Sequence, residues 1–134
     1  NFRTDFLPDS VLKAKELCDE KGIKFLFIST PDTTAWNYAK YEKLSSWTKE
    51  NNIEYLDLNE KIDDMGLNFT DDTDQFGMHM NIIGASKVSK YIGSYLKNNY
   101  TLTNHLSENS SYWQNDLNTY LNEKERAIND LKNR

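Results

Sequence analysis

Five polar residues within residues 71–81 have the types and spacing for proton-transfer chemistry: Asp71, Asp72, Asp74, His79 and Asn81. His79 comes just before a helical pattern whose predicted N-cap is Asn81. The positive end of a helix dipole favours neutral imidazole, which is the form that a general base requires. A carboxylate that accepts the other ring N–H would fix the tautomer and stabilise the imidazolium. This segment predicts a histidine–acid pair at the entrance of a helix.

The same residues also fit a structural role. A histidine near acids at a helix start is commonly a surface or capping residue, and the three aspartates could solvate a loop or form a weak cation site. A calcium loop is not indicated, because it needs ligands at alternate positions and a closing Glu. Cys18 is the only cysteine, so neither an intrachain disulfide nor a multi-cysteine metal site is expected. No metal and no cofactor are predicted, since a Gly-rich nucleotide loop is absent too.

The remaining elements are predicted from the spacing of apolar residues and from the residues that typically end helices and strands. Helices are expected over residues 7–22, with Gly22 as the stop, and over residues 33–52, 82–97 and 110–134. The helix at 33–52 should carry one apolar stripe, made of Tyr38, Tyr41, Leu44 and Trp47. The last helix should carry another, made of Trp113, Leu117, Leu121, Ile128 and Leu131, although Lys124 interrupts the pattern. Strands are expected at 23–30, buried on both faces, and at 53–58, which is weaker. Residues 59–74 indicate a loop with one helical turn.

This order predicts an α/β chain with a parallel sheet. Only two strands are clear, and two parallel strands do not make a stable sheet alone. We therefore expect an upstream part of the same protein, or a second copy, to complete the sheet. The sequence begins without Met, which is typical of a fragment. The net charge of −5 argues against nucleic-acid binding, and no apolar run reaches the length of a membrane span.

The segment "HMNIIGASKVSKYIGSYLKNNY" resembles the last conserved block of SGNH/GDSL-type hydrolases of the bacterial cell-envelope branch. The matching residues are His79, Asn81, Gly84, Ala85, Lys87, Val88 and Ser89. The preceding layout is similar too, with a strand ending in Thr30–Pro31 and Trp36 soon after it. The resemblance covers roughly residues 8–121. It implies a three-layer α/β/α flavodoxin-like SGNH fold, here incomplete, over residues 1–100, followed by an extension with an amphipathic helix over residues 101–134.

The resemblance also implies roles for individual residues. His79 would be the catalytic base, and Asp74 its partner, with Asp72 as the alternative acid. The family commonly places this acid two or three residues before the histidine, whereas Asp74 precedes His79 by five. Asn81, Ser29, Thr30 and Trp36 would contact substrate. The family's nucleophile lies in an upstream Gly-Asp-Ser-like block, which this sequence does not contain, so this chain alone is expected to be inactive.

Two functions follow as expectations. The first is a part of a serine esterase or O-acyltransferase that acts on acylated carbohydrate, or on a small ester, at the cell envelope. The second is a non-catalytic carbohydrate-binding or protein-interaction domain that keeps a degenerate form of the fold. The resemblance implies an extracellular or cell-envelope location, with membrane anchoring through an upstream segment as one arrangement. The first function includes transfer of the acyl group to water or to a sugar.

Overall fold

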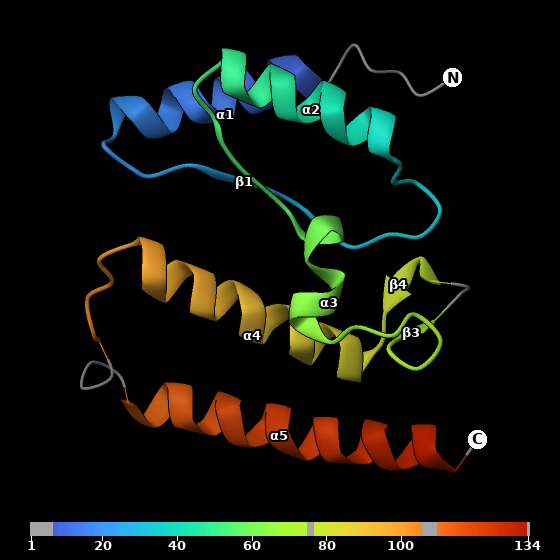
Figure 1. Ribbon diagram of the computed structural model, residues 1–134. Coiled ribbons are helices and arrows are strands. Elements are labelled where there is room, and N and C mark those ends of the chain that lie inside the picture. Colours follow the sequence, from blue (N-terminus) through green and yellow to red (C-terminus); the bar gives the residue numbers. More distant parts are fainter. Residues whose placement is uncertain (1–6, 75–76, 106–109, 134) are drawn as a thin grey trace. The chain divides into compact units, whose positions relative to one another are not determined.

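The computed structural model describes residues 7–74, 77–105 and 110–133 of the chain (Figure 1). The chain is of mixed α/β type and divides into two compact units, residues 1–62 and 63–134. The predicted border between residues 100 and 101 falls inside the second unit. Each unit is described by itself below. Among the described helices, none is both long and apolar enough to cross a bilayer.

The first unit is built around a two-stranded parallel sheet. Its elements are α1 (Leu7–Glu20), β1 (Leu26–Ser29), α2 (Tyr38–Glu50), β2 (Glu54–Asp57) and the 3-10 helix η1 (Leu58–Lys61). Leu26 pairs with Glu54 and Ser29 with Asp57, so the two strands end at the same edge. Helix α2 packs against β2. The parallel pair confirms the predicted strand order and direction.

The burial of the two strands differs from the prediction. All four residues of β1 are only half-buried, whereas β2 carries the buried Leu56 and Asp57. The expectation that β1 is covered on both faces is therefore wrong within the described part of the chain. Two features contribute to this exposure: the described sheet has two strands, which leaves one edge of β1 without a neighbouring strand, and helix α2 packs against β2. The core of this unit lies on the β2 side, where Leu58 is fully buried.

Helix α2 begins later than the periodicity predicts. Asn37 is its N-cap, and the Asn37 side chain accepts a hydrogen bond from the Lys40 amide at 3.0 Å. The residues before it form a turn in which Asp32 Oδ1 accepts bonds from the Thr34 and Ala35 amides, each at 2.7 Å. Local side-chain bonds thus compete with helix formation over residues 33–36.

The second unit is a small hairpin followed by two long helices. Its elements are α3 (Ile62–Met65), which starts at the unit border, β3 (Thr73–Asp74), β4 (His79–Met80), α4 (Ile82–Asn99) and α5 (Ser110–Lys132). Strands β3 and β4 pair in antiparallel fashion. Helix α5 packs against α4, and Lys124 donates a hydrogen bond to the Ser86 hydroxyl. The sequence predicts a loop with one helical turn at 59–74, and the structure has η1, α3 and the strand β3 of the hairpin in this stretch.

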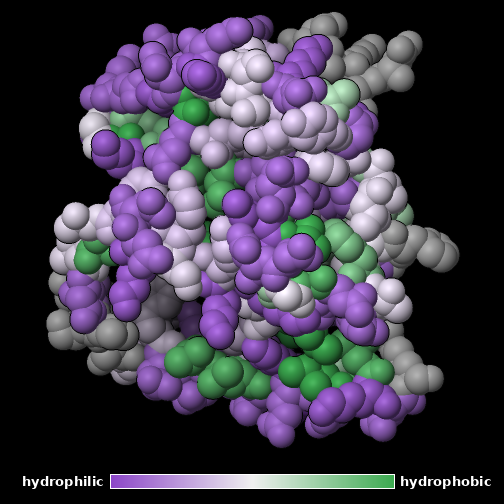
Figure 2. All heavy atoms as spheres, viewed as in Figure 1, coloured by the Kyte–Doolittle hydropathy of each residue, from purple (hydrophilic) through white to green (hydrophobic). Residues whose placement is uncertain are grey.

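Several predicted inward-facing residues are exposed instead. Trp113 is 63% exposed, Leu117 47%, Leu121 49% and Tyr38 60%. In α5 the half-buried side chains lie mainly toward its C-terminal end, at Ala127, Ile128 and Leu131. Figure 2 shows hydrophobic side chains reaching the surface along this helix. A helix with one packing neighbour buries only part of an apolar stripe, which explains the difference.

Candidate functional site

The β3–β4 hairpin brings the predicted catalytic pair together. Asp74 and His79 are directly opposite each other in the antiparallel ladder. Side chains of directly opposed residues project from the same face of a hairpin, with Cβ atoms about 4.5–5.5 Å apart. Both residues are exposed, and neither side chain makes a hydrogen bond or ion pair within the described part of the chain. The two residues therefore face each other although five positions separate them in the sequence.

The connection between the two strands includes Gly77, whose φ is +90°. Residues with a side chain strongly disfavour this conformation, so glycine suits the return of the chain toward β4. His79 then lies two residues before Asn81, the N-cap of α4. His79 is consequently close in the chain to the N-terminus of an 18-residue helix. This local arrangement agrees with the predicted position of a histidine just ahead of a helix N-cap.

Asn81 is buried and its side chain is engaged within the chain. Its Oδ1 accepts hydrogen bonds from the Ile83 amide at 2.9 Å and the Gly84 amide at 3.1 Å. Its Nδ2 donates to the Asp71 carbonyl at 2.8 Å. The predicted N-cap is therefore confirmed. The described contacts give Asn81 a structural role at the helix start, and substrate contact by Asn81 stays a prediction.

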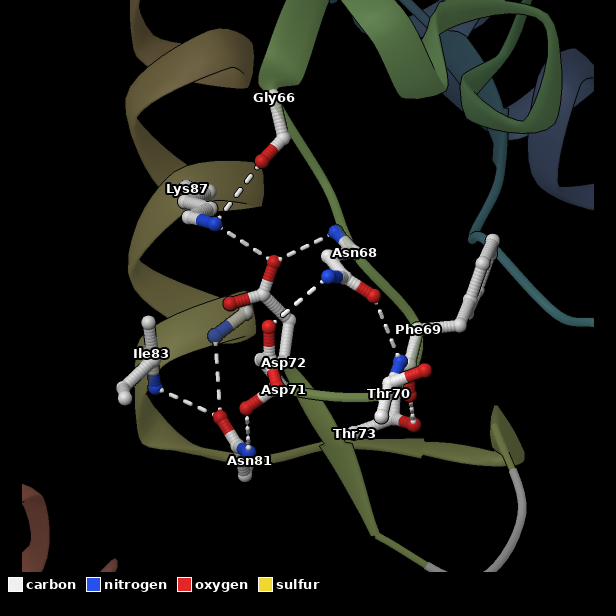
Figure 3. A network of polar contacts seen from close by, with 11 residues as sticks. Gly66, Asn68, Phe69, Thr70, Asp71, Asp72, Thr73, Asn81, Ile83 and Lys87 are labelled. Atoms are coloured by element: carbon white, nitrogen blue, oxygen red, sulfur yellow. Dashed lines mark hydrogen bonds and ion pairs between the residues drawn. The ribbon is translucent and has the colours of Figure 1, made fainter. Parts of the chain in front are cut away.

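Asp72, the alternative acid, has a different environment from Asp74. It is only 1% exposed, and its Oδ2 accepts a bond from Lys87 Nζ at 2.6 Å and from the Asn68 amide at 2.7 Å (Figure 3). Lys87 also donates to the Gly66 carbonyl at 2.8 Å. These bonds fasten the loop before β3 to α4. Of the two acids, Asp74 is the one that lies opposite His79.

Gly84 allows this loop to approach the helix closely. A Cβ atom at position 84 would lie 2.2 Å from the Asp72 carbonyl oxygen and 3.0 Å from Asp72 Cβ. The Asp72 carbonyl also accepts a hydrogen bond from the Asn81 amide at 3.0 Å, which holds this part of the loop against the start of α4. The glycine of the family-like pattern thus has a local physical reason: it lets β3, β4 and the start of α4 pack together.

The three other predicted site residues lie in the first unit and share one pocket. Ser29, Thr30 and Trp36 line a pocket of about 330 Å³ at the carboxyl ends of β1 and β2. We call this the β1–β2 pocket; its wall also includes Tyr41, Tyr55 and Asn59. The carboxyl edge of a parallel sheet is where ligands commonly bind in open α/β proteins.

A buried carboxylate organises the polar wall of the β1–β2 pocket. Asp57 Oδ2 accepts hydrogen bonds from Tyr55 Oη and Trp36 Nε1, each at 2.9 Å. Asp57 Oδ1 accepts bonds from the Asn59 backbone amide at 2.9 Å and from Asn59 Nδ2 at 2.8 Å. Ser29 Oγ lies 2.9 Å from Tyr55 Oη. Burial raises the pKa of Tyr55 well above its ordinary value, so the phenol stays protonated at neutral pH.

This geometry does not activate Ser29 as a nucleophile. The single phenol proton of Tyr55 goes to Asp57, so Ser29 must donate its own proton to the Tyr55 oxygen. A protonated phenol is a very weak base and cannot take that proton away. Sequence reasoning did not identify Tyr55, Asp57 or Asn59. A signal was nevertheless available. Tyr55, Asp57 and Asn59 lie in or just after the second predicted strand, and the carboxyl ends of parallel strands meet at one edge of a sheet.

The described residues contain no group of three or more histidine, cysteine, aspartate or glutamate side chains that could hold a metal ion. Comparisons of the chain with protein-family models, with curated proteins and with solved structures find no match. The interpretation of both sites therefore depends on their own geometry and on the sequence pattern.

Proposed function

We propose that this chain is the C-terminal part of an SGNH-type serine esterase or O-acyltransferase that acts on acylated carbohydrate of the cell envelope. The observation that carries the proposal is the direct opposition of Asp74 and His79 in the β3–β4 ladder. It supports the pairing that the family-like pattern needs, although the two residues are separated by more sequence than is common there. The position of His79 two residues before the N-cap of α4 matches the family-like pattern as well.

In the proposed mechanism, His79 is the general base and Asp74 orients it. A serine supplied from outside this sequence gives its proton to His79 and attacks the ester carbonyl carbon. The tetrahedral intermediate collapses to a seryl ester, and the leaving sugar oxygen takes the proton from His79. Water or an acceptor hydroxyl then gives a proton to His79 and attacks the seryl ester. Collapse of this second intermediate releases the acyl product and returns the proton to serine.

The proposal includes the finer fold and the partner. The β1–β2 pair would belong to a three-layer α/β/α sheet of flavodoxin-like type, completed by an upstream part of the same protein or by a second copy. The half-burial of β1 supports this, because a completed sheet would cover its free edge. An envelope or extracellular location, with anchoring through an upstream segment, belongs to the same proposal.

The test uses a longer protein that includes the upstream Gly-Asp-Ser-like block and a chromogenic acetyl ester. Loss of His79 should lower kcat/KM by about 10²–10⁴-fold, the usual contribution of a general base. The Asp74→Asn variant should lower it as well, because the imidazole would lose its orienting charge. His105→Ala is the matched control, since it removes the other histidine of the chain. Full activity in the His79→Ala variant would overturn the proposal.

A second candidate is a non-catalytic carbohydrate-binding domain. The observation that favours it is the absence of a hydrogen bond between the exposed Asp74 and His79 side chains in the described structure. It predicts that the longer protein binds saccharides but cleaves no ester. The same assay therefore separates the two candidates, provided that binding is measured beside turnover.

A further inference from the structure

The β1–β2 pocket has a hydrogen-bond pattern with a defined direction. Tyr55 donates to Asp57, and this leaves only the Tyr55 oxygen lone pairs for Ser29. The Ser29 hydroxyl hydrogen is consequently used inside the wall. The remaining lone pairs of Ser29 Oγ are acceptors on a residue that lines the pocket. A ligand at this position would have to donate a hydrogen bond to Ser29.

The charges of the pocket wall are largely satisfied within the chain. The Asp57 carboxylate is 6% exposed and accepts four hydrogen bonds. Asp32 and Lys40 line the pocket as well. Asp32 Oδ1 accepts bonds from the Thr34 and Ala35 amides, and the ammonium group of Lys40 donates to the Ala35 carbonyl. A wall whose carboxylate and ammonium groups already have partners favours an uncharged ligand, because an ion would have to displace those partners.

Two aromatic side chains contribute to the apolar part of the wall, beside Ile28, Ala35 and Leu44. Trp36 and Tyr41 both line the pocket, and the bond from Trp36 Nε1 to Asp57 fixes the indole in one orientation. A fixed ring costs little conformational entropy when a ligand packs against it. The C–H face of a saccharide ring packs on aromatic rings through dispersion and burial, while its hydroxyls donate hydrogen bonds. The volume of about 330 Å³ lies at the small end of ligand pockets, which are roughly 300–1,000 Å³.

We infer that the β1–β2 pocket binds one uncharged saccharide ring, with a ring hydroxyl donating to Ser29 Oγ and the ring packed on Trp36. The inference rests on the proposed function for the carbohydrate nature of the substrate and adds the place where the sugar is held. Tyr55 and Asp57 act as positioning residues, since Tyr55 directs the Ser29 hydroxyl and Asp57 directs the Trp36 indole.

The test measures binding by this chain without any turnover. The Trp36 indole N–H signal, assigned through a Trp36→Phe variant, is followed by NMR during titration with glucose, galactose and N-acetylglucosamine. At least one sugar should give saturable shifts, with dissociation constants in roughly the millimolar range that is typical of single small contacts. Glycerol, which has hydroxyls but no ring, should give no saturable shift. Failure of every sugar, or equal binding of glycerol, overturns the inference.

Variants test the assigned direction of the bonds. Ser29→Ala should weaken sugar binding about fivefold, the usual worth of one net hydrogen bond. Ser46→Ala, an exposed serine on α2, is the matched control and should bind as the unchanged chain does. Equal binding by the Ser29→Ala and Ser46→Ala variants overturns the Ser29 assignment. Because these measurements need no catalysis, sugar binding together with full esterase activity in His79→Ala would refute the proposed function and leave the pocket inference standing.

Discussion

Asp72 and Asp74 are two residues apart in the sequence, but their side chains have different surroundings in the structure. Asp72 is buried in an ion pair with Lys87, while Asp74 is exposed opposite His79. The Asp72 carboxylate is bonded to Lys87 and to the Asn68 amide. It is poorly placed to pair with a histidine that gains a proton, because these bonds would have to break first. Among single residues, the acid proposed to orient His79 is therefore the one without structural bonds in the described part of the chain.

Gly84→Ala should destabilise the chain. Its Cβ would lie 2.2 Å from the backbone oxygen of Asp72, so backbone must move, which costs about 1–3 kcal/mol. Gly93→Ala is the matched control in the same helix, since its Cβ would meet nothing within 4 Å. That variant should stabilise the helix by up to about 1 kcal/mol. Denaturant unfolding measures both changes, and equal effects of the two variants would contradict the close approach.

The raised pKa of Tyr55 predicts that the folded chain becomes less stable at alkaline pH. Burial raises its pKa in the folded state, so between the unfolded value of about 10 and the folded value the unfolded chain binds fewer protons. Its contribution to stability is complete below about pH 10 and declines as the pH rises further. Unfolding free energies measured across this range should fall less steeply in Tyr55→Phe than in Tyr112→Phe, which removes an exposed phenol. Identical slopes would contradict the prediction.

At the scale of elements, short segments decide the geometry of the histidine site. The hairpin has two residues in each strand, which by itself is too little for stability. Its support comes from outside the ladder: the Asn81 cap, the Asp72–Lys87 ion pair and the close approach at Gly84. The hairpin is therefore expected to depend on its attachment to α4.

Lys87→Ala tests that attachment. It leaves the Asp72 carboxylate buried without its cation, and a hydrogen bond to a charged group is worth about 1.5–3 kcal/mol, so the variant should lose about that much. Lys15→Ala is the matched control, because Lys15 and Asp19 form an exposed pair on α1. Such pairs contribute only about 0.3–0.5 kcal/mol. Chemical denaturation compares the two, and a loss no larger than that of the control would argue against the role of the ion pair.

For the whole molecule, the main expectation concerns the β1–β2 sheet: we expect a further strand to complete it. Among the described residues it has only two strands, and β1 is half-buried along its length. A completed sheet would bury more of Leu26, Phe27 and Ile28, and each fully buried apolar side chain contributes about 1.5–3 kcal/mol. This expectation concerns either an upstream strand or a strand from a second copy.

Thermal unfolding distinguishes the two partners. If a second copy completes the sheet, the Tm should rise with protein concentration, because association stabilises the folded state by mass action. If an upstream segment completes it, a longer protein should have a higher Tm at every concentration, and light scattering should give the mass of a monomer. A Tm that changes with neither concentration nor upstream extension would contradict the incomplete sheet.

Several features were predictable because they depend on neighbouring residues. The periodic apolar positions indicated α1 and α4, the Phe- and Ile-rich run indicated β1, and Asn81 was the expected cap of α4. The β3–β4 hairpin was not predictable in this way, since strands of two residues show no alternation. The exposure of Trp113 and Leu117 was also missed, because amphipathicity marks an apolar stripe but not the neighbour that covers it.

Sequence patterns alone indicated the histidine ahead of a helix, the candidate acids before it and the parallel order of β1 and β2, but not Tyr55, Asp57 and Asn59 of the β1–β2 pocket. Only the tertiary structure decided that Asp74 lies opposite His79 while Asp72 pairs with Lys87, and that Tyr55 turns the Ser29 hydroxyl inward. The physical reason is that hydrogen-bond partners and burial depend on residues that meet through folding. Spacing along the chain fixes which groups are available, and packing fixes what each of them contacts.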